Sequence, residues 1–227
     1  LCAIVQVFAM GALRTGAASG IATKYMANAD AETLGVLGSG RQARTQVEAV
    51  CAVRPIKRVK VYSPTAANRE KFCRDIAAAF KVEATPVDSP ERAVRDSEII
   101  VSATTAEQPV VCGNWLRPGA HINAIGANYE HRRELDRDAV LAASTIAADD
   151  IEQVRYESTD LAVPVSEGGA LRWADFVLDR AHVRLVGVRE DHSAGETYPV
   201  NTLCALGADA NGTDRAGNTP LLAAART

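Results

Sequence analysis

The stretch from Thr33 to Ala43, TLGVLGSGRQA, constrains the fold of this chain more than any other. An apolar run at 33–37 has the composition of a buried strand, and Gly38 and Gly40 follow it at once. From Gln42 the apolar residues recur at helical spacing. A strand, a glycine turn and a helix in this order carry the dinucleotide-binding fingerprint G-x-G-x-x-A. The stretch therefore predicts a βαβ unit of an α/β fold.

Each small residue of this turn has a physical role in binding a nucleotide. Gly38 permits the tight turn, Gly40 lets the backbone approach a pyrophosphate, and Ala43 lets the helix pack on the strand. Free N–H groups and the positive dipole end at the helix start attract phosphate. We therefore assign the whole turn to cofactor binding: Gly38, Ser39, Gly40, Arg41, Gln42 and Ala43. The alternative is a structural turn that binds nothing, and a second strand one crossover later favours the nucleotide.

Strands and helices alternate along most of the chain. Apolar runs predict strands at 1–10, 58–62, 82–85, 98–105, 120–126 and 144–148. Helical spacing and cap residues predict helices at 17–27, 42–54, 66–80, 90–94 and 170–186, with a linker at 187–199. This alternation is typical of a Rossmann-type, doubly wound, mostly parallel sheet, which binds ligands at the carboxyl ends of its strands.

The end of the second strand predicts which nucleotide binds. NAD-binding units commonly carry an acidic residue there for the ribose hydroxyls, but this chain has Ser63, with Arg69 nearby. A hydroxyl and a guanidinium suit a 2′-phosphate, so NADP is favoured over NAD. The alternative is that Ser63 caps the next helix and Arg69 is solvated. Thr104 and Thr105 end the strand at 98–105, and we assign them to nucleotide contact rather than to strand termination alone.

Composition excludes several classes of protein and site. The formal net charge is −3 and no run of Lys or Arg appears, so we expect no nucleic-acid binding. The five cysteines are scattered without a C-x-x-C pair, which is typical of reduced thiols in a cytoplasmic protein. The histidines lack metal-ligand spacing, so we expect no metal, and His121 is interpreted as a packed strand residue. The apolar start at 1–10 is too short to span a bilayer, so we expect no membrane segment and interpret it as a strand cut from a longer protein.

Two further groups of residues receive structural interpretations. Cys51, Cys73 and Cys112 lie in apolar settings, which favours core residues over catalytic thiols. The mixed charge run at 130–136 predicts a solvated helix face. Neither group is assigned to the site.

Several motifs, in order along the chain, resemble the ornithine cyclodeaminase and mu-crystallin family. They are RTGAAS at 14–19, ATKYMA at 22–27, LGSGRQA at 37–43, SATT at 102–105, GAHINAIGA at 119–127 and RELD at 133–136. The resemblance implies a homodimeric enzyme with a Rossmann domain and a separate substrate and dimerisation domain. It implies hydride exchange between a nicotinamide and the α-carbon of a small amino or imino acid.

The resemblance also implies site residues outside the glycine turn. Arg14 matches the family arginine that grips the substrate carboxylate, and a guanidinium fork suits such a two-point contact. The alternative is an arginine at a surface or helix start. Asn128 stands where cyclodeaminases of the family carry an aspartate that handles protons at the amine. Asparagine takes up no proton but still hydrogen-bonds an amine or imine, so reduction of a ketimine or pyrroline-2-carboxylate is favoured over ornithine cyclodeamination.

The same resemblance suggests four parts in the chain. Residues 1–31 are interpreted as a remnant of the substrate and dimerisation domain, 32–165 as the NAD(P)-binding Rossmann domain, and 166–200 as a helix and linker. Residues 201–227 resemble part of an ankyrin repeat, with GADAN at 207–211 and GNTPL at 217–221. Because a long N-terminal part of the family pattern is absent, the alternative function is a truncated nicotinamide-nucleotide-binding protein without turnover.

Overall fold

The computed structural model describes residues 8–129, 131–148 and 151–166, and the backbone of short strands between 178 and 199. These residues form two compact units. Of the described residues, the first unit contains 8–104 and 116–125, and the second contains 105–115 and those between 126 and 199.

The first unit is built on one parallel sheet. Its strands are β1 (Thr33–Leu37), β2 (Arg58–Tyr62), β3 (Glu83–Pro86), β4 (Ile99–Ser102) and β5 (His121–Ala124). They lie in the order β3-β2-β1-β4-β5, and every neighbouring pair is parallel. Leu37 pairs with Tyr62 on one side and Ser102 on the other, so the carboxyl ends of three strands are level. The predicted α/β fold with a mostly parallel sheet is confirmed, and β4 and β5 are shorter than the runs at 98–105 and 120–126.

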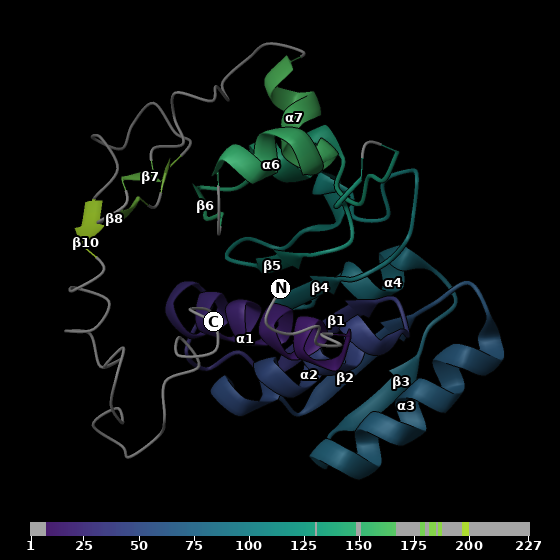
Figure 1. Cartoon of the computed structure of the whole chain (residues 1–227). Helices are drawn as coiled ribbons and strands as arrows, with labels where there is room; N and C mark the ends of the chain where they lie inside the picture. Colours follow the sequence, from purple (N-terminus) through teal and green to yellow (C-terminus); the bar gives the residue numbers. More distant parts are fainter. Residues whose placement is uncertain are drawn as a thin grey trace, which may run out of the picture. The chain divides into compact units, whose positions relative to one another are not determined.

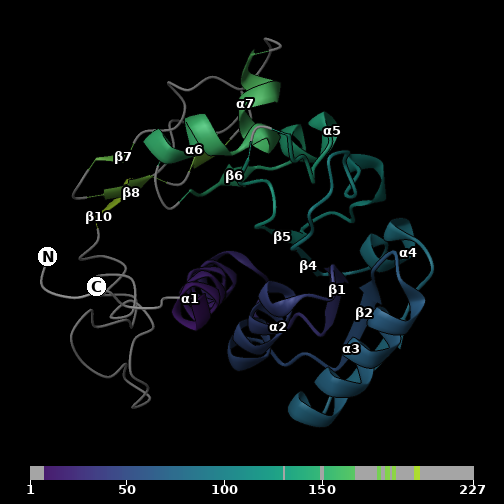
Figure 2. The same cartoon turned by 45° about the vertical axis from the view of Figure 1, so that its right-hand side comes forward.

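Helices cover both faces of this sheet. They are α1 (Phe8–Met26), α2 (Arg41–Val53), α3 (Ala66–Phe80) and α4 (Pro90–Val94). Figure 1 shows α3 running along β2 and β3, and Figure 2 shows α1 beside α2. Leu34 and Val36 of β1 belong to the same apolar cluster as Val47 and Val50 of α2. Because side chains alternate along a strand, Gly35 faces the other way, toward α4.

The close approach of α4 explains a glycine inside a buried strand. All five residues of β1 are buried. A Cβ at Gly35 would lie 2.2 Å from the carbonyl oxygen of Ala93 and 2.9 Å from the hydroxyl of Ser97. The short helix therefore packs directly on the backbone of the strand. Ser89 caps α4 by accepting from the backbone N–H of Arg92, and Pro90 occupies the first turn, as the sequence predicts.

α1 begins earlier than the sequence predicted. The sequence predicted a strand at 1–10 and a helix at 17–27, whereas the helix runs over Phe8–Met26. The expected strand at 1–10 is wrong for Phe8–Met10, which are helical, and residues 1–7 lie outside the described part. A continuous apolar run does not separate a strand from a buried helix. Gly16 and Gly20 bring the middle of α1 close to Thr45 and Ala49 of α2, and the helix extends back from there to Phe8.

Arg54, the residue that follows α2, hydrogen-bonds to backbone carbonyls at the carboxyl end of α1. The guanidinium of Arg54 donates to the carbonyl oxygens of Lys24 at 2.7 Å, Ala27 at 2.8 Å and Asn28 at 2.8 Å. The last turn of a helix leaves such carbonyls without partners. Arg54 therefore joins α1 to the sheet-covering helix α2 within one unit.

The second unit contains short elements. Its helices are α5 (Arg137–Leu141), α6 (Ile151–Glu157), α7 (Thr159–Ser166) and the 3₁₀ turn η1 (Gly113–Trp115). The strand expected at 144–148 is β6 (Thr145–Ile146), which pairs antiparallel with β9 (Val186–Gly187) and is not a sixth strand of the parallel sheet. Antiparallel pairing also joins β7 (Leu178–Asp179), β8 (His182–Arg184) and β10 (Thr197–Pro199).

These pairings correct the helix predicted at 170–186 wherever the backbone is described. The described stretches from 178 to 187 are strands, and residues 170–177 lie outside the described part. Helical spacing of apolar residues was outweighed by strand pairing, both in the local β7–β8 hairpin and between β9 and the distant β6. The ankyrin-like segment at 201–227 also lies outside the described residues, and the four-part domain division stays a prediction. Within the described part, no helix has the length and apolar character to cross a membrane.

Gly35→Ala is expected to destabilise the first unit. The new methyl group would collide with backbone of α4, so we expect the free energy of unfolding to fall by roughly 1–3 kcal/mol or more. Gly11→Ala in α1 is the control, because a Cβ there meets no described atom within 4 Å. The control should be neutral or stabilised by up to about 1 kcal/mol. Urea unfolding followed by circular dichroism measures both, and equal midpoints for the two variants would contradict the packing of α4 on β1.

Candidate functional site

The glycine turn lies at the point in the sheet where the strand order reverses, between β1 and its two neighbours. β2 lies on one side of β1 and β4 on the other, and the chain leaves β1 between their carboxyl ends. Gly38 has φ +105°, donates its N–H to the carbonyl of Tyr62 at 2.9 Å, and would place a Cβ 2.4 Å from the carbonyl oxygen of Ala103. Only glycine meets these conditions. In parallel α/β sheets this is the position at which ligands bind.

Gly40 is a glycine for a different reason. It is the N-cap of α2 with φ −86°, a conformation open to any residue, and no side chain caps the helix there. A Cβ at Gly40 would meet no described atom within 4 Å. The fold therefore needs Gly38 but does not need Gly40. A turn that binds nothing explains the first glycine only, whereas close approach of a phosphate explains both.

The remaining residues of the turn differ in exposure. Arg41 begins α2 and is exposed, whereas Ala43 is fully buried against the sheet. The side-chain oxygen of Gln42 is buried without a hydrogen-bond partner among the described residues, and so are both polar atoms of Gln46 one turn later. Sequence reasoning assigned Gln42 to the site but gave no signal for Gln46.

Ser39 and Ser63 link the turn to the end of β2. The hydroxyl of Ser39 donates to the hydroxyl of Ser63 at 3.0 Å, and Ser63 is buried. Arg69 donates from its guanidinium to the carbonyl of Ser63 at 2.9 Å, so it folds back on this corner instead of being solvated. The N-cap of α3 is Thr65, so Ser63 does not cap that helix. The corner thus combines hydroxyls and a guanidinium, with no carboxylate directly after β2.

Thr104 and Thr105 follow β4 and are not part of it, because the strand ends at Ser102. The methyl group of Thr104 lies 3.6 Å from the position of a Cβ at Gly38, so Thr104 adjoins the glycine turn. Thr105 belongs to the second unit and is not placed beside the turn. Arg14 is exposed on α1 in the first unit and makes no ion pair with a described residue.

Asn128 lies in the second unit, on the segment that follows β5 in the chain. Its side chain is exposed, and its Oδ1 accepts from Arg132 at 3.1 Å. The guanidinium of Arg132 also lies 5.0 Å from the ring centre of Tyr129. No described residue accepts from Nδ2 of Asn128. The amide is therefore oriented with its oxygen occupied and its N–H groups left to donate.

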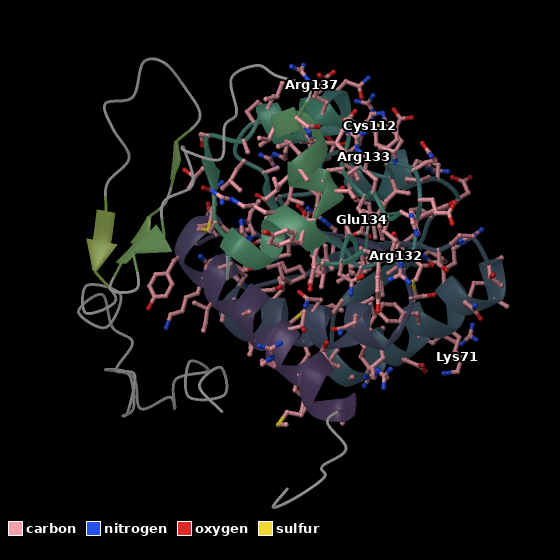
Figure 3. All side chains as sticks on the ribbon, turned by 45° about the horizontal axis from the view of Figure 1, so that its top comes forward. Lys71, Cys112, Arg132, Arg133, Glu134 and Arg137 are labelled. Atoms are coloured by element: carbon pink, nitrogen blue, oxygen red, sulfur yellow. The ribbon has the colours of Figure 1, made fainter. Side chains whose placement is uncertain are left out.

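Two buried carboxylates support this segment, and the sequence gave no signal for them. Figure 3 labels Arg132, Arg133 and Glu134, which follow one another in the segment. Glu134 is 0% exposed, and its Oε2 accepts from the backbone N–H of Gly126 at 2.6 Å. Asp160 of α7 is 2% exposed, and its Oδ1 accepts from the backbone N–H groups of Glu134 at 2.7 Å and Leu135 at 2.9 Å. The solvated helix face predicted at 130–136 is wrong, because Glu134 and Leu135 are buried and the described residues 131–136 are not helical.

Asp160 also has an unusual ionisation. Burial raises the pKa of its carboxyl from 3.8 to about 6, against the lowering effect of the two backbone hydrogen bonds from Leu135 and Glu134. The charge of Glu134 raises this pKa further and that of Arg133 lowers it. Oδ2 of Asp160 has no hydrogen-bond partner among the described residues.

His121, Cys51 and Cys73 are packed against other residues of the first unit and have structural roles. His121 is buried, its Nε2 lies 3.2 Å from Oδ1 of Asn123, and burial lowers its pKa. Asn123 in turn donates to the hydroxyl of Thr23 on α1 at 2.9 Å. Burial raises the pKa of the Cys51 and Cys73 thiols to about 11, in agreement with their interpretation as core residues. Among the described residues, no cluster of His, Cys, Asp and Glu could hold a metal ion.

A hollow of about 380 Å³ lies elsewhere in the first unit. Its charged lining comes from β2, β3 and the α4 region: Arg58, Lys60, Glu83, Arg92 and Asp96. None of the residues assigned to nucleotide or substrate binding lines it. Because both signs of charge are mixed there, the hollow favours no single class of ligand, and we assign it no function.

Comparison with known proteins agrees with this geometry. The sequence pattern of the ornithine cyclodeaminase/mu-crystallin family matches residues 1–187. A delta(1)-pyrroline-2-carboxylate reductase of Bacillus cereus is 38% identical over 156 residues, which are 69% of this chain and 48% of that protein. The ketimine reductase mu-crystallin of Macropus fuliginosus is 35% identical over 156 residues, again 69% of this chain and 48% of that protein.

A solved structure shares the fold. It is the delta(1)-pyrroline-2-carboxylate reductase of Thermococcus litoralis in complex with NADH and L-proline, with a TM-score of 0.71 and 40% sequence identity. The similarity covers 74% of this chain and 51% of that one. The chain thus spans about half the length of these relatives.

The raised pKa of Asp160 predicts a pH-dependent stability. Because folding favours the protonated carboxyl, this group stabilises the fold fully below pH 3.8, and the contribution is lost as pH rises through about 6. A shift of this size corresponds to roughly 3 kcal/mol. The difference in free energy of unfolding between Asp160→Asn and the wild type should therefore increase from pH 4 to pH 7. Urea unfolding at several pH values measures it, and a difference independent of pH would contradict the assignment.

Proposed function

Since this chain belongs to the ornithine cyclodeaminase/mu-crystallin family, we propose that it binds a nicotinamide nucleotide and acts in the reduction of a small cyclic imino acid. The imino acid class is that of pyrroline-2-carboxylate. The observation that carries the proposal is Gly40, which the fold does not need and which leaves open space at the N-terminus of α2. Phosphate binding gives this glycine a reason.

The nucleotide would bind at the carboxyl ends of β1, β2 and β4. The N-terminus of α2, with its positive dipole end, and the nearby Thr104 support contact with the phosphates. The corner of Ser39, Ser63 and Arg69 offers hydroxyl and guanidinium donors and no carboxylate after β2. This supports NADPH over NADH, because a 2′-phosphate finds donors there and meets no negative charge. The relative with NADH bound shows that a nicotinamide nucleotide fits this type of fold.

The substrate roles of Arg14 and Asn128 are supported by chemistry. When bound, the nicotinamide supplies the hydride. Arg14, exposed and without an ion pair to a described residue, has its guanidinium available for a carboxylate. Asn128 presents N–H donors while Arg132 holds its oxygen, so it can orient a polar group but not carry a proton. Reduction of a preformed imine needs less proton handling than cyclisation of a diamine, which favours the reductase reaction.

A nucleotide-binding protein without turnover is the second candidate. It shares the glycine turn but predicts no reaction with any imino acid. The homodimer implied by the family and the cytoplasmic location suggested by the scattered cysteines stay predictions as well. Sedimentation of the purified chain measures the first of these directly.

The nucleotide site is tested at Gly40. Gly40→Asp places a carboxylate in open space at the expected phosphate position, so we expect NADPH affinity to fall about 100-fold by like-charge repulsion. Gly40→Ala is the matched control for loss of the glycine alone and should bind more weakly than the wild type but better than Gly40→Asp. Fluorescence titration with NADPH and NADH measures all three proteins. Equal affinity of the wild type and Gly40→Asp would refute the site.

The reaction is tested at Arg14. The wild type should oxidise NADPH in the presence of pyrroline-2-carboxylate, and Arg14→Ala should raise KM for the imine by roughly 10- to 100-fold through loss of a charge-assisted contact. Arg14→Lys should recover only part of this, because lysine lacks the planar fork. Affinity for NADPH should be the same in all three. Tight NADPH binding without oxidation in the wild type would favour the second candidate.

A further inference from the structure

We propose that Glu134 is a positioning residue for Asn128, and that Asp160 holds Glu134 in place. The inference rests on the proposed function, because Asn128 matters to the reaction only if this segment takes part in imine binding. All of the contacts involved lie within the second unit.

Glu134 acts on the backbone just before Asn128. Its carboxylate accepts the N–H of Gly126 at 2.6 Å, and the carbonyl of Gly126 accepts the N–H of Asn128 at 2.9 Å. The N–H of Gly126 is thus bound by the carboxylate of Glu134, and its carbonyl is bound by the N–H of Asn128. A hydrogen bond to an ionised acceptor is stronger than one between neutral groups.

The burial of Glu134 indicates that its role is specific. A fully buried carboxylate is costly, and solvent does not compensate it there. Gly126 and Ala127 are buried as well, whereas Asn128 is exposed. The buried part of the segment is therefore fixed, and the exposed side chain that follows is the one available to a ligand.

The first turn of α7 holds the rest of the segment. Asp160 accepts the backbone N–H groups of Glu134 and Leu135, while the hydroxyl of Thr159 donates to the carbonyl of Arg132. Arg132 is the residue that donates to the side chain of Asn128. Thr159 thus holds Arg132, which contacts the side chain of Asn128. Asp160 holds Glu134, which fixes the backbone at Gly126, two residues before Asn128.

The backbone carbonyl of Glu134 is hydrogen-bonded to the segment at 110–111. Its carbonyl accepts the backbone N–H groups of Val110 at 2.8 Å and Val111 at 2.9 Å. The backbone of Glu134 is therefore held at both its N–H and its carbonyl. A carboxylate on so constrained a backbone has little freedom to leave Gly126.

A double-mutant cycle separates positioning from general stability. Glu134→Ala should lower kcat/KM for pyrroline-2-carboxylate by roughly 10- to 100-fold, whereas Glu134→Gln, which keeps an acceptor for Gly126, should recover most of it. In an Asn128→Ala background, Glu134→Ala should change kcat/KM by less than about threefold, because the residue through which it acts is gone. Affinity for NADPH should be unchanged throughout.

The matched control is Asp136→Ala. Asp136 accepts the N–H groups of Ala139 at 2.7 Å and Gly113 at 2.9 Å, so the variant also removes two part-buried acceptor contacts from the second unit but does not touch Gly126. It should leave kcat/KM within about threefold of the wild type. A loss equal to that of Glu134→Ala, or the same loss from Glu134→Ala in both backgrounds, would overturn the proposal.

Amide exchange tests the placement without any turnover. By NMR, exchange of the Gly126 N–H should be roughly 10- to 100-fold faster in Glu134→Ala, relative to Ala139 in the same protein, and near the wild-type rate in Glu134→Gln. The side-chain amide resonances of Asn128 should shift in Glu134→Ala. If the wild type reduces no imine, the proposed function fails, and the exchange result decides the placement alone. Unchanged exchange at Gly126 overturns it.

Discussion

The carboxyl end of β1 is held on both sides by backbone hydrogen bonds, and the candidate nucleotide site depends on this. The N–H of Gly38 donates to Tyr62 of β2, while the N–H of Ala103 after β4 donates to Leu37. The turn is thus fixed between two neighbours before any ligand is present. Rigid placement of this kind would let the N-terminus of α2 act as a preformed site for the phosphates of the proposed nucleotide.

The second unit is organised around buried carboxylates. Glu134 and Asp160 are both almost fully buried, and they accept one and two backbone N–H groups, respectively, from a segment without regular structure. Such a segment has no helix or strand ladder to satisfy its backbone, so side-chain acceptors take that role. The cost is visible in Asp160, whose pKa is raised to about 6 by burial.

Local patterns in the sequence predicted the first unit well. The glycine turn, the strand before it and the cap at Ser89 each depend on residues close together in the chain, and all three have the expected local structure. The prediction failed at Phe8–Met10 and at β6, where the choice depends on distant partners. Small residues of α1 pack on α2, and β6 pairs with residues about forty positions later, so neither result is written in local spacing.

The sequence was sufficient to establish the family and the α/β class, because a glycine turn between a strand and a helix has few alternatives. It also predicted which residues form the glycine turn of the proposed nucleotide site, since that chemistry depends on their size and spacing. The tertiary structure was needed to show that a side chain at Gly40 would meet no described atom. It was also needed to show that Arg69 donates to the carbonyl of Ser63 and that Glu134 is buried. The bonds of Arg69 and Glu134 span six and eight positions through irregular turns, and Asp160 holds the backbone of Glu134 from 26 positions away, so tertiary structure and not residue spacing decides them.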